Sequence, residues 1–342
     1  MGLSLQQNSA GYAAASRGSP GHKYARIALK ALLVTNMWPT DENPALGIFV
    51  SDQVDALRRS GAEVDVFSFP HGGLLAYIKA AARLASQRRD RYDIVHAHFG
   101  LSAWVALGAR AKIRAVTFHG TDLAHPRSRK LSLKALRFID MPAAASEPLA
   151  ASIPDGATTK RIEVLPCGVS MDRFQPMNKQ AARAELNLPL DKRIILFPSD
   201  PARPEKHFDR AQKIAAAAGA ILITLGGVPP AEVPIRISAA DLVLIPSERE
   251  GFGLAVLEAL ACETPVISTP VGIAPSSTAG VQGAHAVEWD QAAWERLAES
   301  AFTEGMTIGG RKSASRWSSE ACAGQVIGAW TRAIAASNNT RS

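Results

Sequence analysis

Cysteine is scarce in this sequence: the 342 residues include three, Cys167, Cys262 and Cys322, which lie far apart along the chain. An odd number of distant cysteines argues against a disulfide framework and against a zinc site, so we expect reduced thiols. The sequence also lacks an apolar run of roughly 20 residues, the length that a membrane-spanning helix requires. Residues 1–25 lack the apolar core of a signal peptide, so we expect a flexible leader and a cytoplasmic protein.

Acidic residues are in deficit, but only in the first half of the chain. Residues 26–175 contain 20 Lys and Arg against 14 Asp and Glu, whereas residues 176–335 contain 15 against 17. A one-sided basic excess indicates an anionic partner for that half. No recognised nucleic-acid motif accompanies the charge, so we do not expect nucleic acid to be that partner.

Short apolar runs alternate with amphipathic helical stretches from end to end. Apolar runs without alternating polar residues indicate strands buried on both faces, as in a parallel sheet covered by helices. Repeated strand–helix alternation predicts a doubly wound α/β fold. In the first half, the predicted strands are 26–35, 63–69, 93–99, 115–120 and 141–146, and the predicted helices between them are 50–60, 74–87 and 102–110.

The same pattern restarts after a join near residues 169–175, and the second set of predicted strands is 193–199, 220–226, 241–247, 264–269 and 284–289. Two similar parallel sheets facing one another place a ligand cleft between the carboxyl ends of their strands. We therefore predict two Rossmann-like domains, over 26–170 and 171–317. The segment 318–342 is expected to form a helix that packs back on the first domain, followed by a tail.

The most informative stretch is 241–269, where a buried strand runs into a polar turn and then a helix. Glu250 precedes Gly251-Phe252-Gly253, and Glu258 lies on the second turn of the helix that follows. Glycines before a helix let the backbone approach a ligand, and free N–H groups there favour a phosphate. A helix carboxylate can accept hydrogen bonds from ribose hydroxyls. In isolation, a surface helix whose acids complement its dipole explains the spacing equally well.

With its context, this stretch resembles the E-x7-E signature of glycosyltransferase family 4, whose members are retaining enzymes of the GT-B fold. The preceding aspartate strand, the helix 254–262 and the strand 264–269 all fit that signature. The resemblance extends in order over residues 27–335. Its other segments are the first strand and glycine loop in 33–57, the histidine strands 93–98 and 117–122, and the inter-domain segment 164–174.

The resemblance implies a role for each matching residue. Glu258 would hold the ribose hydroxyls, and Glu250 would contact the hydroxyls of the transferred sugar. Lys206 would pair with the diphosphate, while His119 would contact the donor sugar. Gly47 would let the first loop approach the diphosphate. The remaining implied donor contacts come from one turn and helix start, namely Gly251, Phe252, Gly253 and Leu254.

Many family members carry Gly-Arg shortly before the lysine, where this chain has Asp200-Pro201. We expect Arg203 to supply the missing guanidinium. The nucleotide sugar is a substrate, so the resemblance implies no cofactor and no bound metal. His96 and His98 share one face of a strand, and we interpret them as structural histidines, with substrate contact or a metal pair as alternatives.

The predicted activity is transfer of a sugar from a nucleotide sugar to an acceptor, which is a cell-envelope glycan, a lipid-linked molecule or a small molecule. Two alternatives stay open. One is a GT-B epimerase of nucleotide sugars, which would use carboxylates as acid and base. The other is a catalytically inactive protein that binds nucleotide sugars.

The basic excess has one sharper local feature in residues 127–139, where Lys130, Lys134 and Arg137 share one helical face. The neighbouring arc carries apolar side chains, those of Leu131, Ala135, Phe138 and Ile139. We expect the first half either to dock on an anionic membrane, at the inner membrane face, or to bind an acceptor that carries phosphate. An ordinary surface helix with its apolar side in the core is the alternative.

Overall fold

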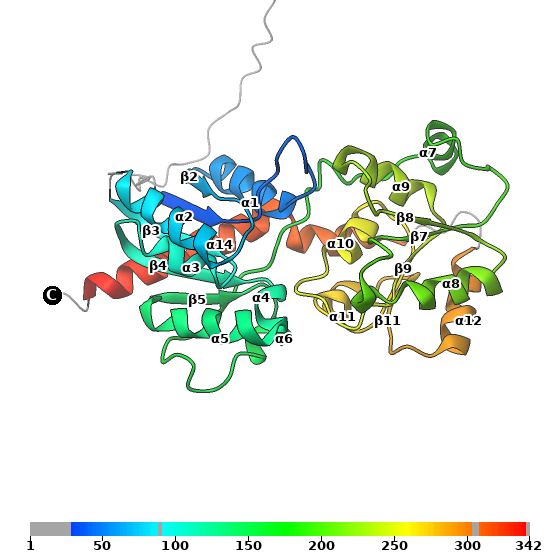
Figure 1. Ribbon diagram of the computed structural model, residues 1–342. Helices are drawn as coiled ribbons and strands as arrows, with labels where there is room; N and C mark the ends of the chain where they lie inside the picture. The colour runs from blue at the N-terminus through cyan, green and yellow to red at the C-terminus, as the bar shows by residue number, and fades with distance from the viewer. Residues whose placement is uncertain (1–28, 88–90, 303–307, 340–342) are drawn as a thin grey trace, which may run out of the picture.

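The computed structural model describes residues 29–87, 91–302 and 308–339. The expected leader, 1–25, lies outside the described residues. The predicted architecture of two parallel sheets with helices is confirmed, and each sheet belongs to one half of the chain (Figure 1). The three cysteines are free and buried, as expected for reduced thiols.

The first sheet has six parallel strands in the order β2-β1-β3-β4-β5-β6. Its strands are β1 Lys30–Thr35, β2 Glu63–Ser68, β3 Tyr92–His98, β4 Ala111–Phe118, β5 Met141–Ala144 and β6 Glu163–Val164. The strand β6 was not predicted, because it has two residues and no apolar run. The order of the strands reverses between β1 and β3, which opens a crevice at their carboxyl ends.

Helices cover both faces of this sheet, as the buried apolar runs require. On one face lie α1 Ile48–Arg59 and α14 Ser319–Asn339, which pack against each other and share a core with β1 and β4. The other face is covered by α2 Leu74–Ser86, α3 Ser102–Ala106 and α5 Pro126–Ala135. The short helices α4 Thr121–Ala124 and α6 Glu147–Ala151 follow β4 and β5.

The predicted helix 127–139 is α5 followed by a 3₁₀ turn over Leu136–Phe138. The four residues of the expected apolar arc lie in two different environments. Ala135 and Ile139 are buried in the core, whereas Leu131 is 46% exposed and Phe138 is 45% exposed. Leu131 and Phe138 lie at one edge of the arc and Ala135 and Ile139 at the other, so the arc crosses the boundary between the surface and the core.

The second sheet has five parallel strands in the order β11-β10-β9-β7-β8. Its strands are β7 Ile194–Phe197, β8 Ile221–Thr224, β9 Leu242–Ile245, β10 Val266–Ser268 and β11 Ala284–Ala286. Its helices are α7 Lys179–Glu185, α8 Phe208–Ala217, α9 Val233–Ala239, α10 Leu254–Ala261, α11 Ala274–Thr278, α12 Gln291–Ala301 and α13 Gly310–Ala314. Here the order reverses between β7 and β9, so this sheet also has a crevice at the carboxyl ends of its strands.

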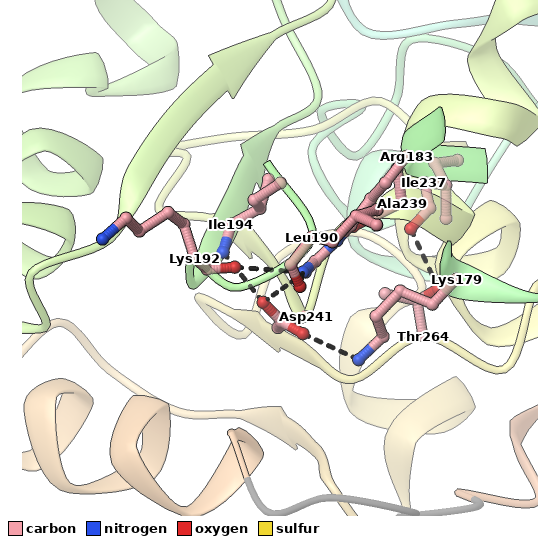
Figure 2. Close-up of polar contacts among 9 residues, drawn as sticks. All are labelled: Lys179, Arg183, Leu190, Lys192, Ile194, Ile237, Ala239, Asp241 and Thr264. Atoms are coloured by element: carbon pink, nitrogen blue, oxygen red, sulfur yellow. Dashed lines mark hydrogen bonds and ion pairs between the residues drawn. The ribbon is translucent and has the colours of Figure 1, made fainter. Parts of the chain in front are cut away.

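A buried ion pair braces the amino ends of the second sheet (Figure 2). The Arg183 guanidinium donates to Asp241 at 2.7 Å and to the carbonyl oxygen of Ala239 at 2.9 Å. The same carboxylate accepts from the backbone N–H of Ile194 at 2.8 Å, and its other oxygen accepts from Lys179. Because Asp241 precedes β9, this network lies at the opposite end of the strand from the glycine turn. The aspartate of the motif is therefore a structural residue.

Among the described residues, no helix combines the length and the apolar character that crossing a membrane would require.

Candidate active site

A cavity of about 470 Å³ lies between the two halves of the molecule, at the carboxyl ends of both sheets. The second half supplies the ends of β7 and β9, at Phe197 and Ile245, and the start of α10. The first half supplies the start of α1 and the segment that follows β4. The predicted residues that line the cavity are His119, Arg203, Lys206, Glu250, Gly251, Phe252, Gly253, Leu254 and Glu258. The structure thus brings all the predicted site residues except Gly47 to the lining of one cavity.

The glycine turn brings the two halves of the molecule into contact. A Cβ atom at Gly251 would collide with the carbonyl oxygen of His119 in the first half, so only glycine fits there. Ser146, which directly precedes α6, donates a hydrogen bond of 2.7 Å to the Gly251 carbonyl oxygen. Gly253 has φ 93°, a left-handed conformation that glycine adopts without strain, and it begins α10. The turn therefore presents its backbone at the cavity wall, beside the amino end of a helix.

Lys206 and Glu250 form a buried ion pair in the lining of the cavity. Lys206 ends a 3₁₀ turn over Pro204–Lys206, and its ammonium lies 2.5 Å from the Glu250 carboxylate. The Ser247 hydroxyl donates to the same carboxylate oxygen at 2.8 Å. Both side chains are more than four-fifths buried, so the lysine is held as a fixed positive charge beside the glycine turn. A fixed cation next to free backbone N–H groups is suited to a phosphate group.

Glu258 lies on α10, one turn beyond the glycine turn. Burial raises the pKa of its carboxyl group to about 7, although the nearby Arg173 guanidinium acts in the opposite direction and Asp52 adds to the rise. Arg173 forms a bidentate pair with Asp52 of α1, at 2.9 and 2.6 Å. The carboxyl group is therefore half ionised near neutral pH, at a wall where hydroxyl groups of a ligand could donate to it.

His119 follows the last residue of β4 and lies in the cavity wall of the first half. Its backbone N–H donates to the buried carboxylate of Asp122. Its ring packs between Phe49 and Phe99, with ring centroids at 5.1 and 4.7 Å, and its Nε2 lies 3.0 Å from Nδ1 of His98. Burial holds the pKa of His119 well below its ordinary value, so the imidazole is neutral and serves as a hydrogen-bonding group rather than a charge.

The two strand histidines lie behind His119, in the core. The indole N–H of Trp330, from α14, donates to Nδ1 of His96 at 3.1 Å, so Nε2 of His96 carries the proton that it donates to Thr117 at 2.8 Å. The pKa of His98 is lowered by burial to about 4, and its Nε2 has no hydrogen-bond partner within the described part of the chain. Across the described ranges, no group of three or more His, Cys, Asp and Glu side chains is placed to hold a metal ion. These contacts favour the structural interpretation of His96.

Two predicted residues stand apart from this arrangement. The Arg203 guanidinium reaches the cavity wall, but it is paired with Glu205 at 2.7 Å and is about half exposed. Gly47 begins α1 with φ 65°, and a Cβ atom there would collide with the carbonyl oxygen of Met37. Gly47 therefore lets the first loop fold tightly behind Ile48, which lines the cavity.

Sequence reasoning missed several residues that the structure brings to the site. Arg173 belongs to the inter-domain segment that matches the family. Its pairing with Asp52 and its proximity to Glu258 join residues far apart in the chain, so no sequence pattern indicates them. Ser247 lies directly in the motif, three residues before Glu250, and a hydroxyl at that spacing was a signal that could have been used. Cys167 lines the cavity 3.8 Å from His119, with burial raising the pKa of its thiol.

Two facing parallel-sheet domains with a ligand cavity between them define a GT-B fold. A family model described as glycosyl transferases group 1 matches residues 204–321, and the model of glycosyltransferase family 4 matches residues 70–173. Together the two segments cover well over half of the chain, in the order that the fold requires. The chain belongs to the group 1 glycosyltransferases of the family 4 type, and it is a transferase enzyme.

Known proteins agree with this assignment. The chain is 28% identical over 319 residues to a Bacillus subtilis protein named as a candidate glycosyltransferase of teichuronic acid biosynthesis, covering 71% of this chain and 82% of that one. It is 28% identical over 293 residues to a D-inositol 3-phosphate glycosyltransferase of Streptosporangium roseum, covering 69% and 67%. Anabaena HepE in complex with UDP and glucose has a similar fold, with a TM-score of 0.65, 16% identity and coverage of 89% and 100%.

Proposed function

We propose that this enzyme is a retaining glycosyltransferase that binds a nucleotide-sugar donor in the cavity between its two domains. One observation carries the proposal: a fixed lysine–glutamate pair, a glycine turn and a helix carboxylate from the second half line one cavity, together with His119 from the first half. This set matches a donor that has a sugar, a diphosphate and a ribose in series. The donor is a substrate, and we propose that no further cofactor or metal takes part.

The proposed roles follow the order of groups along the donor. The diphosphate lies against the N–H groups of the glycine turn and the amino end of α10, beside Lys206. Glu258 accepts hydrogen bonds from the ribose hydroxyls, and Glu250 accepts from hydroxyls of the sugar. The charge that builds up on the departing phosphate is stabilised by Lys206, with Arg203 as a second cation after it leaves Glu205. The sugar is transferred by a same-face displacement that the leaving phosphate assists, with His119 contacting the sugar.

We also propose a phosphate-bearing or membrane-held acceptor of the cell envelope, in polysaccharide or glycolipid biosynthesis. The basic excess of residues 26–175 supports an anionic acceptor on the side of the first domain. The names of the relatives, inositol 3-phosphate and teichuronic acid, are consistent with anionic acceptors. We place the domain boundaries near residues 170 and 317, and the enzyme at the cytoplasmic face of a membrane.

A thermal-shift panel of nucleotide sugars and free nucleoside diphosphates tests the donor proposal. A ligand at about 100 times its Kd should stabilise the folded state by about 2.7 kcal/mol, which is a clear rise in the melting temperature. The Glu258→Ala variant should lose that rise. If no member of the panel raises the melting temperature of the wild-type enzyme, the proposal of a nucleotide-sugar donor fails.

A further inference from the structure

The helix α2 turns an apolar face away from the protein. Leu74 is 75% exposed, Leu75 is 63% exposed and Ile78 is 55% exposed. The exposed Ala82 and Ala85 continue the same arc toward the end of the helix, whereas Ala80 and Leu84 occupy the arc that faces the core. Large apolar side chains at this exposure and spacing are unusual on the surface of a helix, where polar residues normally lie.

A second exposed apolar pair lies on the same side of the first sheet. Leu131 of α5 and Phe138 of the following turn are each close to half exposed, and Phe138 packs edge-on against Trp104 of α3 at 5.7 Å. The helices α2, α3 and α5 lie next to one another over one face of the sheet (Figure 1). These helices and the turn 136–138 carry five of the nine exposed large hydrophobic residues of the described part of the chain. We call the outer side of α2, α3, α5 and the turn 136–138 the docking face.

The charge of the docking face is entirely basic. The helices α2 and α5, with the turn 136–138, contain seven Lys and Arg and no Asp or Glu, and α3 has no charged residue. On the opposite side of the sheet, α1 and α14 contain three basic and three acidic residues. The seven bases are Lys79, Arg83, Arg127, Arg129, Lys130, Lys134 and Arg137. An apolar surface on elements that carry only positive charge is complementary to the surface of an anionic bilayer.

A side cavity lies between α2 and the proposed active site. It has a volume of about 180 Å³ and is lined by Tyr77 of α2 and by Asn36, whose amide donates to the Tyr77 hydroxyl at 2.9 Å. Three of its lining residues, Met37, Phe99 and Thr121, also line the donor cavity. The side cavity therefore has Tyr77 of α2 on one side and adjoins the donor cavity that His119 lines on the other.

We propose that the docking face lies on an anionic lipid bilayer, and that the acceptor is an amphiphile held in that bilayer whose polar head enters the side cavity. Leu74, Leu75 and Ile78 enter the lipid, and the bases of α2 and α5 contact anionic headgroups. This inference rests on the proposed function, because the side cavity receives an acceptor only if the neighbouring cavity holds a sugar donor. It places the acceptor on the side of His119 opposite the nucleotide.

Flotation with vesicles tests the proposal, using equal parts of phosphatidylcholine and phosphatidylglycerol at low salt. Wild-type enzyme should float with these vesicles and not with phosphatidylcholine alone. The triple change Leu74→Ser, Leu75→Ser and Ile78→Ser should weaken the partitioning about 100-fold, since three large apolar side chains leave the lipid. The matched control makes the same change at three exposed apolar residues elsewhere, Met177, Leu190 and Ile221, and should partition as the wild type does.

The charge half of the proposal has its own test. The triple change to Glu at Lys130, Lys134 and Arg137 should abolish flotation at low salt, and added salt should weaken flotation of the wild type. The proposal is overturned if wild-type enzyme ignores anionic vesicles, or if the control variant loses as much partitioning as the α2 variant. It is also overturned if light scattering shows a dimer that the α2 changes dissociate, because a second copy would then cover the face.

Measuring nucleotide binding in the same variants separates this proposal from the proposed function. If the enzyme binds a nucleotide sugar but does not bind vesicles, only the proposal that the docking face lies on a bilayer is contradicted. Enzyme that floats with vesicles but binds no nucleotide sugar contradicts the proposed function instead.

Discussion

Replacing Glu258 with Gln should make the enzyme more stable and a weaker binder of nucleotides, both in a pH-dependent way. Burial raises the pKa of this carboxyl group from 4.5 to about 7 in the folded protein. Between these values the unfolded chain has already released the proton, while the folded protein retains it. The unfolded state therefore binds fewer protons, and the free energy of unfolding falls as the pH rises through this window. Above about pH 7 the free energy of unfolding has fallen by the full amount.

The size of the effect follows from the pKa difference. One pKa unit corresponds to about 1.4 kcal/mol, so this shift has an upper limit of about 3 kcal/mol, and partial solvent access reduces it to about 1–3 kcal/mol. Glutamine does not titrate, so the Gln variant does not lose unfolding free energy as the pH rises. We expect Glu258→Gln to exceed the wild type in unfolding free energy by that amount at about pH 8, and to differ little at about pH 4.5.

Nucleotide binding should change in the opposite direction. The carboxylate accepts hydrogen bonds from ribose hydroxyls better than the neutral acid does, so wild-type affinity for a nucleoside diphosphate should rise with pH through about 7. The Gln variant should bind about tenfold more weakly at about pH 8.

Urea denaturation at several pH values, with calorimetry of nucleotide binding, measures both effects. Glu248→Gln is the matched control, because Glu248 is an exposed glutamate close to the same turn and should change neither quantity. The reasoning about burial is refuted if the stability gain of Glu258→Gln is the same at low and high pH. The assigned role is refuted if its nucleotide affinity equals that of the wild type.

Three further changes test separate parts of the account. Lys206→Ala should lower the rate of sugar transfer at least about 100-fold with little change in fold. Stopped assays of nucleotide release measure the rate, and circular dichroism checks the fold. A fully active variant would show that Lys206 does not stabilise the leaving group. Gly251→Ala should push the two halves apart, because the added methyl group meets the His119 carbonyl oxygen. The rate of sugar transfer should then fall far more than the affinity of the second domain for nucleotide. An unchanged transfer rate would contradict the close contact. Asp241→Ala should lower the free energy of unfolding by about 3–5 kcal/mol, because it leaves the buried Arg183 guanidinium unpaired. The nucleotide affinity of the folded fraction should stay the same.

The strands were predictable from the sequence because a strand buried on both faces leaves an uninterrupted apolar run. Ile194–Phe197 and Leu242–Ile245 are fully buried, and both runs were predicted to within a few residues. The two-residue strand Glu163–Val164 has a partly exposed, polar sequence, so no local pattern marked it. Whether the apolar side of 127–139 faces outward or into the core stayed open in the sequence, because spacing defines which residues share a helix face but not which face meets the core; the structure turns Leu131 and Phe138 outward.

The composition of the site was predictable from its motifs, but the contacts within it were not. Lys206 and Glu250 are 44 residues apart, and their pairing depends on how a 3₁₀ turn faces the glycine turn after the sheet has formed. The hydrogen bond from Trp330 to His96 spans 234 residues and requires α14 to return to the first sheet. The pKa of Glu258 depends on burial between both domains, which no spacing in the sequence expresses.

The most direct test of the central claim is product analysis with a panel of isotopically labelled nucleotide sugars. The wild-type enzyme, supplied with anionic vesicles that contain membrane lipid extract, should release the nucleoside diphosphate from one donor and transfer its label to an acceptor with the anomeric configuration retained. The Lys206→Ala and Glu258→Ala variants should not do so. The account is contradicted if the wild-type enzyme returns an epimerised nucleotide sugar, or if both variants turn the donor over as fast as the wild type.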